Sequence, residues 1–213
     1  MNYKEFICEV FGDFNKNNID FIILRKDEII FEKIKNEDVD ILISLKDDEK
    51  VKNIFLKKKL TTYTDSKYNN IYLYKSKPHK HYYDKKICIN FDVCFDISYS
   101  SINNKEFIPI DDDELELIWQ NKIKIYKNNF FYYKMDRYSQ LIHLICHCIF
   151  DKNQFSRYYS DQINNLLNQK IDHELLLKML KKNFYKFADK LLELLLTKKF
   201  DTIFKNYLTF KEY

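Results

Sequence analysis

The chain has 213 residues and a net charge of +4 from 36 basic and 32 acidic side chains, a balance that does not by itself indicate a nucleic-acid binder. A hydrophobic fraction of 46% excludes a disordered chain, and the length allows one core plus a smaller helical companion. Five cysteines without a framework spacing, an acidic N-terminal segment without signal-peptide layout and no apolar run of transmembrane length predict a cytoplasmic protein with reduced thiols.

The first quarter of the chain predicts a helix and two strands. Apolar residues spaced three and four apart indicate an amphipathic helix over 2–16, and a β-rich run at 19–25 follows it. The second strand is "DVDILIS" at 38–44. Ser44 and Asp47 have the spacing of a capping box, so we expect a helix to begin there.

The middle of the chain is typical of a sheet with one polar face. After "NIYLYKS" (70–76) and the polar loop "KPHKHYYDKK", residues 86–98 alternate strictly. One face carries only apolar side chains, and the other carries Cys88, Asn90, Asp92, Cys94, Asp96 and Ser98. Such alternation predicts a strand with one face on the core and one face toward a cleft or water.

The remaining segments predict a helix, a hairpin and a helical region. "IPIDDDELELIWQN" (108–121) has the acids of a helix start, and 122–135 is typical of a hairpin turning at Asn128 and Asn129. Helical periodicity begins at Asp136 and recurs at 156–169, 172–182 and 184–197. We therefore predict an α+β domain over 1–120, and a hairpin plus a helical domain over 121–213.

Asp38 and Asp40 share one face at the start of a strand that otherwise reads as buried, because side chains alternate along a strand. Two carboxylates held close together repel each other, which raises the pKa of one of them or requires a bound cation. The nine residues "NEDVDILIS" favour a metal site and a solvated strand end equally.

Three motifs together resemble the nucleotidyltransferase superfamily with the DNA polymerase β-like fold, and in particular small bacterial nucleotidyltransferase-like proteins. They are "ILRK" at the end of the first strand, Asp38-Val39-Asp40, and Asp92 between Phe91 and Val93; the resemblance covers 19–98. It implies a mixed sheet flanked by helices and followed by a C-terminal helical domain.

The resemblance also implies an activity, which is transfer of a nucleoside monophosphate from a nucleoside triphosphate to an acceptor, with release of pyrophosphate. Asp38, Asp40 and Asp92 would be the catalytic ligands of Mg²⁺ (or Mn²⁺), and Arg25 and Lys26 would bind the triphosphate. The acceptor would carry a hydroxyl or phosphate on a small molecule, a glycan, an RNA or a protein.

Two positions depart from the family pattern or leave it ambiguous. Lys26 stands where close relatives have glycine, so the triphosphate would be bound by the side chains of Arg25 and Lys26, or the site has decayed. Asp96 shares a face with Asp92, about 13 Å further along an extended strand, so only one can be the third ligand. The hydrophobic flanks of Asp92 favour it.

Alternatives to a transferase are a non-catalytic protein of the same fold that binds a partner protein or RNA, and a metal-dependent nuclease. The nuclease is disfavoured because no lysine follows Asp92 or Asp96 by two positions. A zinc site in "HLICHC" (143–148) is geometrically conceivable, but a packed helix is the favoured interpretation. His79 and His81 lie in a lysine-containing loop that could contact phosphate or a polyanion, but a solvated loop is the favoured interpretation. A chain with one glycine excludes Gly-rich phosphate loops.

Overall fold

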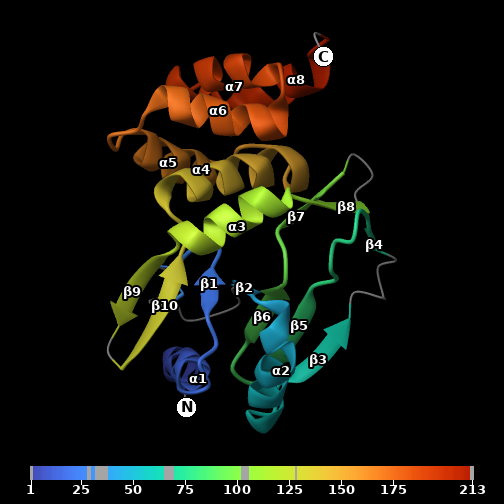
Figure 1. Cartoon of the computed structure of the whole chain (residues 1–213), viewed down its shortest axis with the longest axis vertical. Helices are drawn as coiled ribbons and strands as arrows, with labels where there is room; N and C mark the ends of the chain where they lie inside the picture. The colour runs from blue at the N-terminus through green and yellow to red at the C-terminus, as the bar shows by residue number, and fades with distance from the viewer. Residues whose placement is uncertain are drawn as a thin grey trace. The chain divides into compact units, whose positions relative to one another are not determined.

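The computed structural model describes residues 2–27, 30–31, 38–64, 70–101, 106–127 and 129–211. The chain forms two compact units (Figure 1). The first comprises Met1–Ser98 and Lys105–Asp136, and the second comprises Tyr99–Asn104 and Arg137–Tyr213. The first unit combines helices with a mixed sheet, and the second is mainly helical, so the protein belongs to the α+β class.

The described part of the first unit contains a seven-stranded sheet in the order β3-β5-β6-β2-β1-β10-β9. In that order the strands span Thr61–Thr64, Lys80–Asp84, Ile89–Cys94, Asp38–Ile43, Phe21–Ile23, Phe130–Lys134 and Ile123–Lys127. β2 runs parallel to β6 and antiparallel to β1. The two strands that carry the predicted acids are therefore direct neighbours in the middle of the sheet.

One face of this sheet packs against α1 (Tyr3–Lys16) and α2 (Asp48–Lys57). The alternating apolar residues of β2 and β6, among them Val39, Ile41 and Phe91, join the aromatic side chains of α1 and Phe55 of α2 in one core cluster. Burial of this apolar surface is the main stabilising contribution. Since period two assigns every second residue to this core, the acids fall on the opposite face.

The hairpin β9–β10 belongs to the first unit, so the predicted domain boundary at 120/121 differs from the observed division at 136/137. The reason is strand pairing: β10 adds to the sheet beside β1, in parallel, with Ile22 opposite Tyr133. Asn129 lies in the turn as expected, and Asn128 lies outside the described residues. Asn15 of α1 also holds β10, since its side chain exchanges hydrogen bonds with the backbone of Phe131.

Smaller elements complete this unit. β4 (Ile71–Tyr72) pairs in parallel with β8 (Glu106–Pro109), and α3 (Asp112–Asn121) follows β8. β7 (Ser98–Ser100) spans the point where the chain passes from one unit to the other. The predicted segment 70–76 thus forms only a two-residue strand, followed by a turn.

Two local predictions were wrong. Ser44 makes no capping hydrogen bond, because a 3-10 turn (Leu45–Asp47) precedes α2 and the helix begins after Asp47. The alternating stretch 86–98 is not one continuous strand. It forms β6 over Ile89–Cys94, which a turn precedes and a bend at Phe95 and Asp96 follows, and its last residue, Ser98, begins β7. Alternation continued in the sequence beyond the residues that pair with neighbouring strands.

The second unit is built from α4 (Arg137–Cys146), a π-helical turn (His147–Asp151), α5 (Arg157–Leu167), α6 (His173–Phe184), α7 (Phe187–Leu196) and α8 (Phe200–Thr209) (Figure 1). The helices predicted near 156–169, 172–182 and 184–197 are confirmed, and α8 was not predicted. Leucines of α6 and α7 form part of its buried interior. Within the described ranges, none of the helices combines the length and apolarity that a membrane span requires.

Candidate functional site

The predicted acids meet on the face of the sheet opposite the aromatic core. Asp40 on β2 is in register with Asp92 on β6, and Asp92 is in register with His81 on β5. Residues in register on neighbouring strands point to the same face, so these three polar side chains form a row across the sheet. Asp38 lies two residues before Asp40 on that face, in register with Asn90. The structure thus brings the three predicted acids together.

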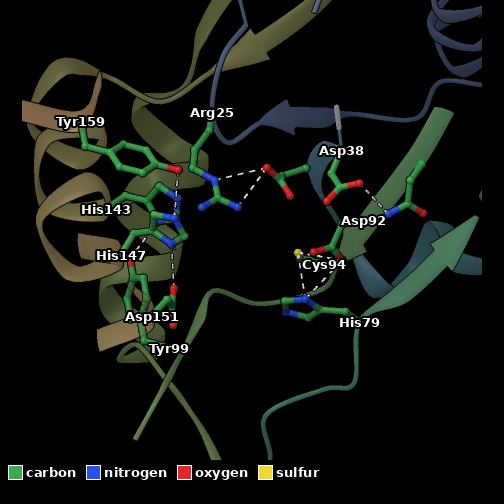
Figure 2. Close-up of polar contacts among 12 residues, drawn as sticks. Arg25, Asp38, His79, Asp92, Cys94, Tyr99, His143, His147, Asp151 and Tyr159 are labelled. Carbon is green, nitrogen blue, oxygen red and sulfur yellow. Dashed lines mark hydrogen bonds and ion pairs between the residues drawn. The ribbon is translucent and has the colours of Figure 1, made fainter. Parts of the chain in front are cut away.

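Asp38 and Asp40 each accept bonds from a different donor (Figure 2). Asp38 is exposed, and its Oδ1 accepts a hydrogen bond of 2.9 Å from the side-chain amide of Asn90. Asp40 is buried, and its Oδ2 lies 2.9 Å from Nη2 and 3.2 Å from Nε of Arg25. The structure therefore places Arg25 against one of the proposed metal ligands, a pairing that the sequence did not predict.

The charge balance around Asp40 favours additional positive charge. Burial raises the pKa of Asp40, Arg25 lowers it, and the nearby charges of Asp92 and Asp38 raise it again, so the net pKa is raised. The bonded guanidinium thus does not fully compensate the desolvated carboxylates. A cation on this face would relieve that repulsion.

Asp92 faces a second group of polar atoms on the β5 side (Figure 2). Its Oδ1 lies 3.2 Å from Nδ1 of His79 and 3.9 Å from the sulfur of Cys94, and the same Nδ1 lies 3.6 Å from that sulfur. Nδ1 of His81 is 3.8 Å from the same oxygen. Among the described residues, His79, Asp92 and Cys94 are the group of His, Cys, Asp or Glu whose donor atoms all lie within 4.8 Å of one another.

The pKa values of this second group move in opposite directions. Burial raises the pKa of Asp92, but the bond and charge of His79, with His81 and Arg25, outweigh burial and lower it. Burial lowers the pKa of His79, but Cys94 and Asp92 raise it well above its ordinary value. Burial and the charge of Asp92 raise the pKa of Cys94 to about 12. The opposite shifts of His79 and Asp92 favour the charged form of both side chains, and the raised pKa of Cys94 favours its thiol form.

The interpretation of His79 and His81 as parts of a solvated loop was wrong. Their side chains are only 17% and 13% exposed. The signal in the sequence was the pair of histidines two residues apart, which strand alternation places on one face, but the surrounding lysines made the segment look solvated. Cys94 had been assigned to the polar face, and its position two residues after Asp92 explains why both face His79.

Lys26 takes the backbone conformation that a glycine would favour. Its φ is 60°, in the left-handed region, and it follows Arg25 in the segment just after β1. Non-glycine residues adopt this region at a cost of about 1–2 kcal/mol. Lys26 therefore adopts, with a side chain, a backbone conformation that glycine adopts without this cost.

Asp96 has a different role from Asp92. It lies beyond the end of β6, where its Oδ2 accepts 2.7 Å from the backbone N–H of Lys77 and its Oδ1 accepts 3.3 Å from the hydroxyl of Ser76. These bonds fix the segment that leads into His79. Asp96 is therefore placed as a support for this segment, outside the row formed by Asp40 and Asp92.

A further buried polar network lies in the second unit, around the π-helical turn (Figure 2). Nδ1 of His147 lies 2.7 Å from Oδ2 of Asp151, and its Nε2 lies 3.2 Å from the hydroxyl of Tyr159. Nδ1 of His143 lies 2.8 Å from the hydroxyl of Tyr99. Both histidines are buried and make polar contacts with tyrosine hydroxyls or an aspartate, as the packed-helix interpretation of "HLICHC" predicted.

The residues on the sheet face fit a divalent cation by chemistry, since carboxylates are the ligands that Mg²⁺ prefers. The three acids are adjacent, although within the described part of the chain they do not converge as closely as the His79 group. Arg25 on Asp40 and Asn90 on Asp38 account for separate orientations of these carboxylates. Comparisons with known proteins found no matching protein-family model, no matching curated protein and no matching solved structure.

Proposed function

We propose that this chain is a metal-dependent nucleotidyltransferase, which transfers a nucleoside monophosphate from a nucleoside triphosphate to an acceptor. The observation that carries the proposal is the register of Asp40 beside Asp92 on parallel central strands, with Asp38 two residues away on the same face. The observed α+β architecture with a mixed sheet is compatible with the fold class that the sequence motifs imply. The acids that carry the proposal lie on β2 and β6, which are far apart in the chain and adjacent in the sheet.

Asp38, Asp40 and Asp92 would hold Mg²⁺ or Mn²⁺ in this proposal. When bound, such ions neutralise charge on the triphosphate and lower the pKa of an acceptor hydroxyl. The protein contributes the fixed carboxylates, a strand backbone that spaces them, and a partly desolvated face on which electrostatic interactions are strong.

Arg25 and Lys26 would supply positive charge for the triphosphate at the end of β1. A guanidinium carries five N–H donors in a planar fork, so Arg25 can contact a phosphate while it orients Asp40. The left-handed φ of Lys26 turns the backbone directly after this arginine. Together they form the proposed substitute for a glycine-containing turn.

One observation favours a second candidate, a non-catalytic protein of the same fold that binds a partner protein or RNA. Each acid already has a donor within the protein: Asn90 for Asp38, Arg25 for Asp40 and His79 for Asp92. Such pairing is what a site that had lost its metal would need. The acids would then be structural.

The two candidates are separated by measuring melting temperature with Mg²⁺ or Mn²⁺ and each of the four nucleoside triphosphates, because a ligand that binds only the folded state stabilises it. The transferase predicts an increase with metal and nucleotide together. Asp38→Asn and Asp40→Asn should abolish this increase while the far-ultraviolet circular dichroism spectrum is unchanged. No increase in the wild type with any combination would favour the binding protein.

Turnover provides the sharper test once a nucleotide has been identified. Asp92→Asn should reduce pyrophosphate release at least about a hundredfold, mainly through kcat, because the change alters a ligand close to the reacting groups. The matched control is Asp96→Asn, a buried acid of the same chain segment outside the row, which should keep most of the turnover. Equal losses in both variants would remove Asp92 from the proposed ligand set.

A further inference from the structure

We infer that a thiophilic divalent cation, Zn²⁺, binds to Nδ1 of His79, a carboxylate oxygen of Asp92 and the sulfur of Cys94. The three donor atoms face one another in Figure 2, on the β5 side of the acid row. The inference goes beyond the proposed function and does not depend on nucleotide transfer: Asp92 is shared with the proposed magnesium site, but His79 and Cys94 belong to this site alone.

The distances between the donors fit a tetrahedral ion. Zinc bonds of about 2.0–2.3 Å at tetrahedral angles separate nitrogen, oxygen and sulfur donors from one another by about 3.4–3.6 Å. The observed separations are 3.2 Å from nitrogen to oxygen, 3.6 Å from nitrogen to sulfur and 3.9 Å from sulfur to oxygen. Small side-chain rotations suffice to centre an ion on this triangle.

The donor types distinguish this site from the proposed magnesium site. Imidazole and thiolate are ligands for zinc and related transition metals, whereas Mg²⁺ takes oxygen ligands. Three protein ligands also leave a fourth position for water or another molecule, an arrangement typical of zinc sites that are not closed structural sites.

The sheet itself brings the ligands together. Asp92 and Cys94 are two residues apart on β6 and share a face. His79 immediately precedes β5, whose Lys80 is in register with Val93, so continuing the antiparallel register by one residue places His79 opposite Cys94. The ligands therefore lie on neighbouring, regularly paired backbone segments, which is how precise metal sites are supported.

Aromatic rings position the imidazole of His79. Tyr72 and Phe107 stack on each other with centroids 5.2 Å apart, and their centroids lie 6.2 Å and 6.4 Å from that of His79. Nε2 of His79 is buried and has no hydrogen-bond partner among the described residues. The polar contacts of the ring are thus made through Nδ1, the nitrogen that would bind the ion.

Cobalt substitution tests the site on the full-length, metal-free protein without nucleotide or magnesium. Tetrahedral Co²⁺ bound to a thiolate gives a charge-transfer absorption band in the near ultraviolet and visible bands of high intensity. We expect these bands to saturate at a single equivalent of Co²⁺ and to disappear when Zn²⁺ is added. Absence of a thiolate band in the folded protein would overturn the inference.

Variants assign the ligands. Cys94→Ser should remove the charge-transfer band and weaken Zn²⁺ binding, measured by competition with a chromogenic chelator, at least about tenfold. His79→Gln should also weaken binding by at least that factor. The matched control is Cys88→Ser, which changes an exposed cysteine in the turn before β6 and should leave the band intact. A band that follows Cys88 would contradict the assignment.

Two further measurements keep the test decisive. Asp38→Asn should leave cobalt and zinc binding unchanged even if it abolishes the effect of nucleotide and magnesium, which separates this inference from the proposed function. If Cys94→Ser fails to fold, X-ray absorption at the zinc edge of the wild-type protein takes its place. A single sulfur scatterer with nitrogen and oxygen neighbours supports the site, and a shell without sulfur overturns it.

Discussion

The two histidine clusters of this protein differ in what surrounds the imidazole rings. In the second unit, His147 lies between a carboxylate and a phenol, 2.7 Å from Asp151 and 3.2 Å from Tyr159. On the sheet of the first unit, His79 faces both the carboxylate of Asp92 and a thiol, and Asp92 belongs to a row with the buried Asp40. The cluster around His147 satisfies a histidine by hydrogen bonds, while the cluster around His79 brings together side chains that can bind a metal ion.

This difference teaches that spacing along a helix is a weak indicator of a metal site. "HLICHC" contains two histidines and two cysteines within six residues, yet Cys146 and Cys148 are buried thiols and the histidines bond to tyrosines and an acid. The closer set of donors combines three residues from two paired backbone segments. Strand pairing, which the spacing does not reveal, decides which donors meet.

The largest change in stability is expected on the sheet, where the guanidinium of Arg25 neutralises part of the charge of the acid row. Arg25→Met should lower the free energy of unfolding by about 3 kcal/mol near pH 7, because it leaves a buried carboxylate without its charged partner. The pKa of Asp40 is already raised and should rise further in the variant. A group with a raised folded-state pKa loses stability as pH rises through that pKa, so the destabilisation should shrink on acidification.

Urea denaturation at about pH 7.5 and about pH 5 measures both parts of this prediction. The matched control is Arg157→Met, since the side chain of Arg157 is 96% exposed and its Nε lies 3.9 Å from Oδ2 of the exposed Asp161. We expect less than about 0.5 kcal/mol there, independent of pH. Equal effects of the two substitutions would show that the acid row does not depend on Arg25.

The hydrogen-bonded cluster of the second unit should respond differently. Asp151→Ala removes the acceptor of His147 and of the backbone N–H of Ser100, at 2.7 Å and 2.8 Å. Leaving these donors without an acceptor should cost about 2 kcal/mol. Thermal unfolding should show this loss, and zinc or magnesium should not restore stability. Asp161→Ala, at an exposed position of α5, is the control and should be nearly neutral.

The sequence predicted on which face of a strand a residue lies better than it predicted which strands pair with each other. Period two assigned Asp38, Asp40, Asp92 and Cys94 to polar faces correctly, because alternation is a local property. The pairing of β2 with β6 links residues about fifty positions apart, and only the family resemblance placed Asp92 with the other acids. Local pattern alone could not supply that non-local contact.

Other features remained hidden for physical reasons that are equally specific. β5 contains lysine and histidine among its tyrosines, so it resembled a solvated loop although the neighbouring strands bury Tyr82 completely and His81 mostly. The hairpin β9–β10 was recognised from its turn, but its addition to the sheet depends on pairing with β1. The pairing of Arg25 with Asp40 depends on the antiparallel register of β1 and β2, which cannot be predicted from the local sequence pattern.

A smaller effect tests the charge pairing of His79 with Asp92. The raised pKa of His79 stabilises the folded state at pH values below the ordinary histidine pKa, and this contribution is lost as pH rises through the folded-state value. The lowered pKa of Asp92 contributes above the ordinary aspartate pKa and is lost as pH falls through its folded-state value. Both contributions are fully present between about pH 4 and pH 6.5.

His79→Gln should therefore destabilise the metal-free protein by about 1 kcal/mol in that window, and by less above and below it. Unfolding by urea across the pH range, for wild type and variant, gives the difference directly. His173→Gln, at the exposed start of α6, is the control and should show no such maximum. A difference that is constant with pH would indicate packing of the ring as its main role.

The smallest effect is expected at Lys26, where the backbone conformation and the side chain can be separated. Lys26→Ala keeps a β-carbon at a φ of 60° and removes the ammonium, whereas Lys26→Gly removes both. The glycine variant should be more stable than the alanine variant by up to about 1 kcal/mol, because relief of left-handed strain exceeds the entropic cost of glycine in the unfolded chain. Chemical denaturation of the pair measures this difference without any assumption about ligands.

Nucleotide binding to the same pair then isolates the side chain: equal weakening in both variants would mean that the ammonium contacts the triphosphate. Tighter binding by the glycine variant than by the alanine variant would instead mean that the backbone turn, which glycine adopts more readily, is what the triphosphate needs.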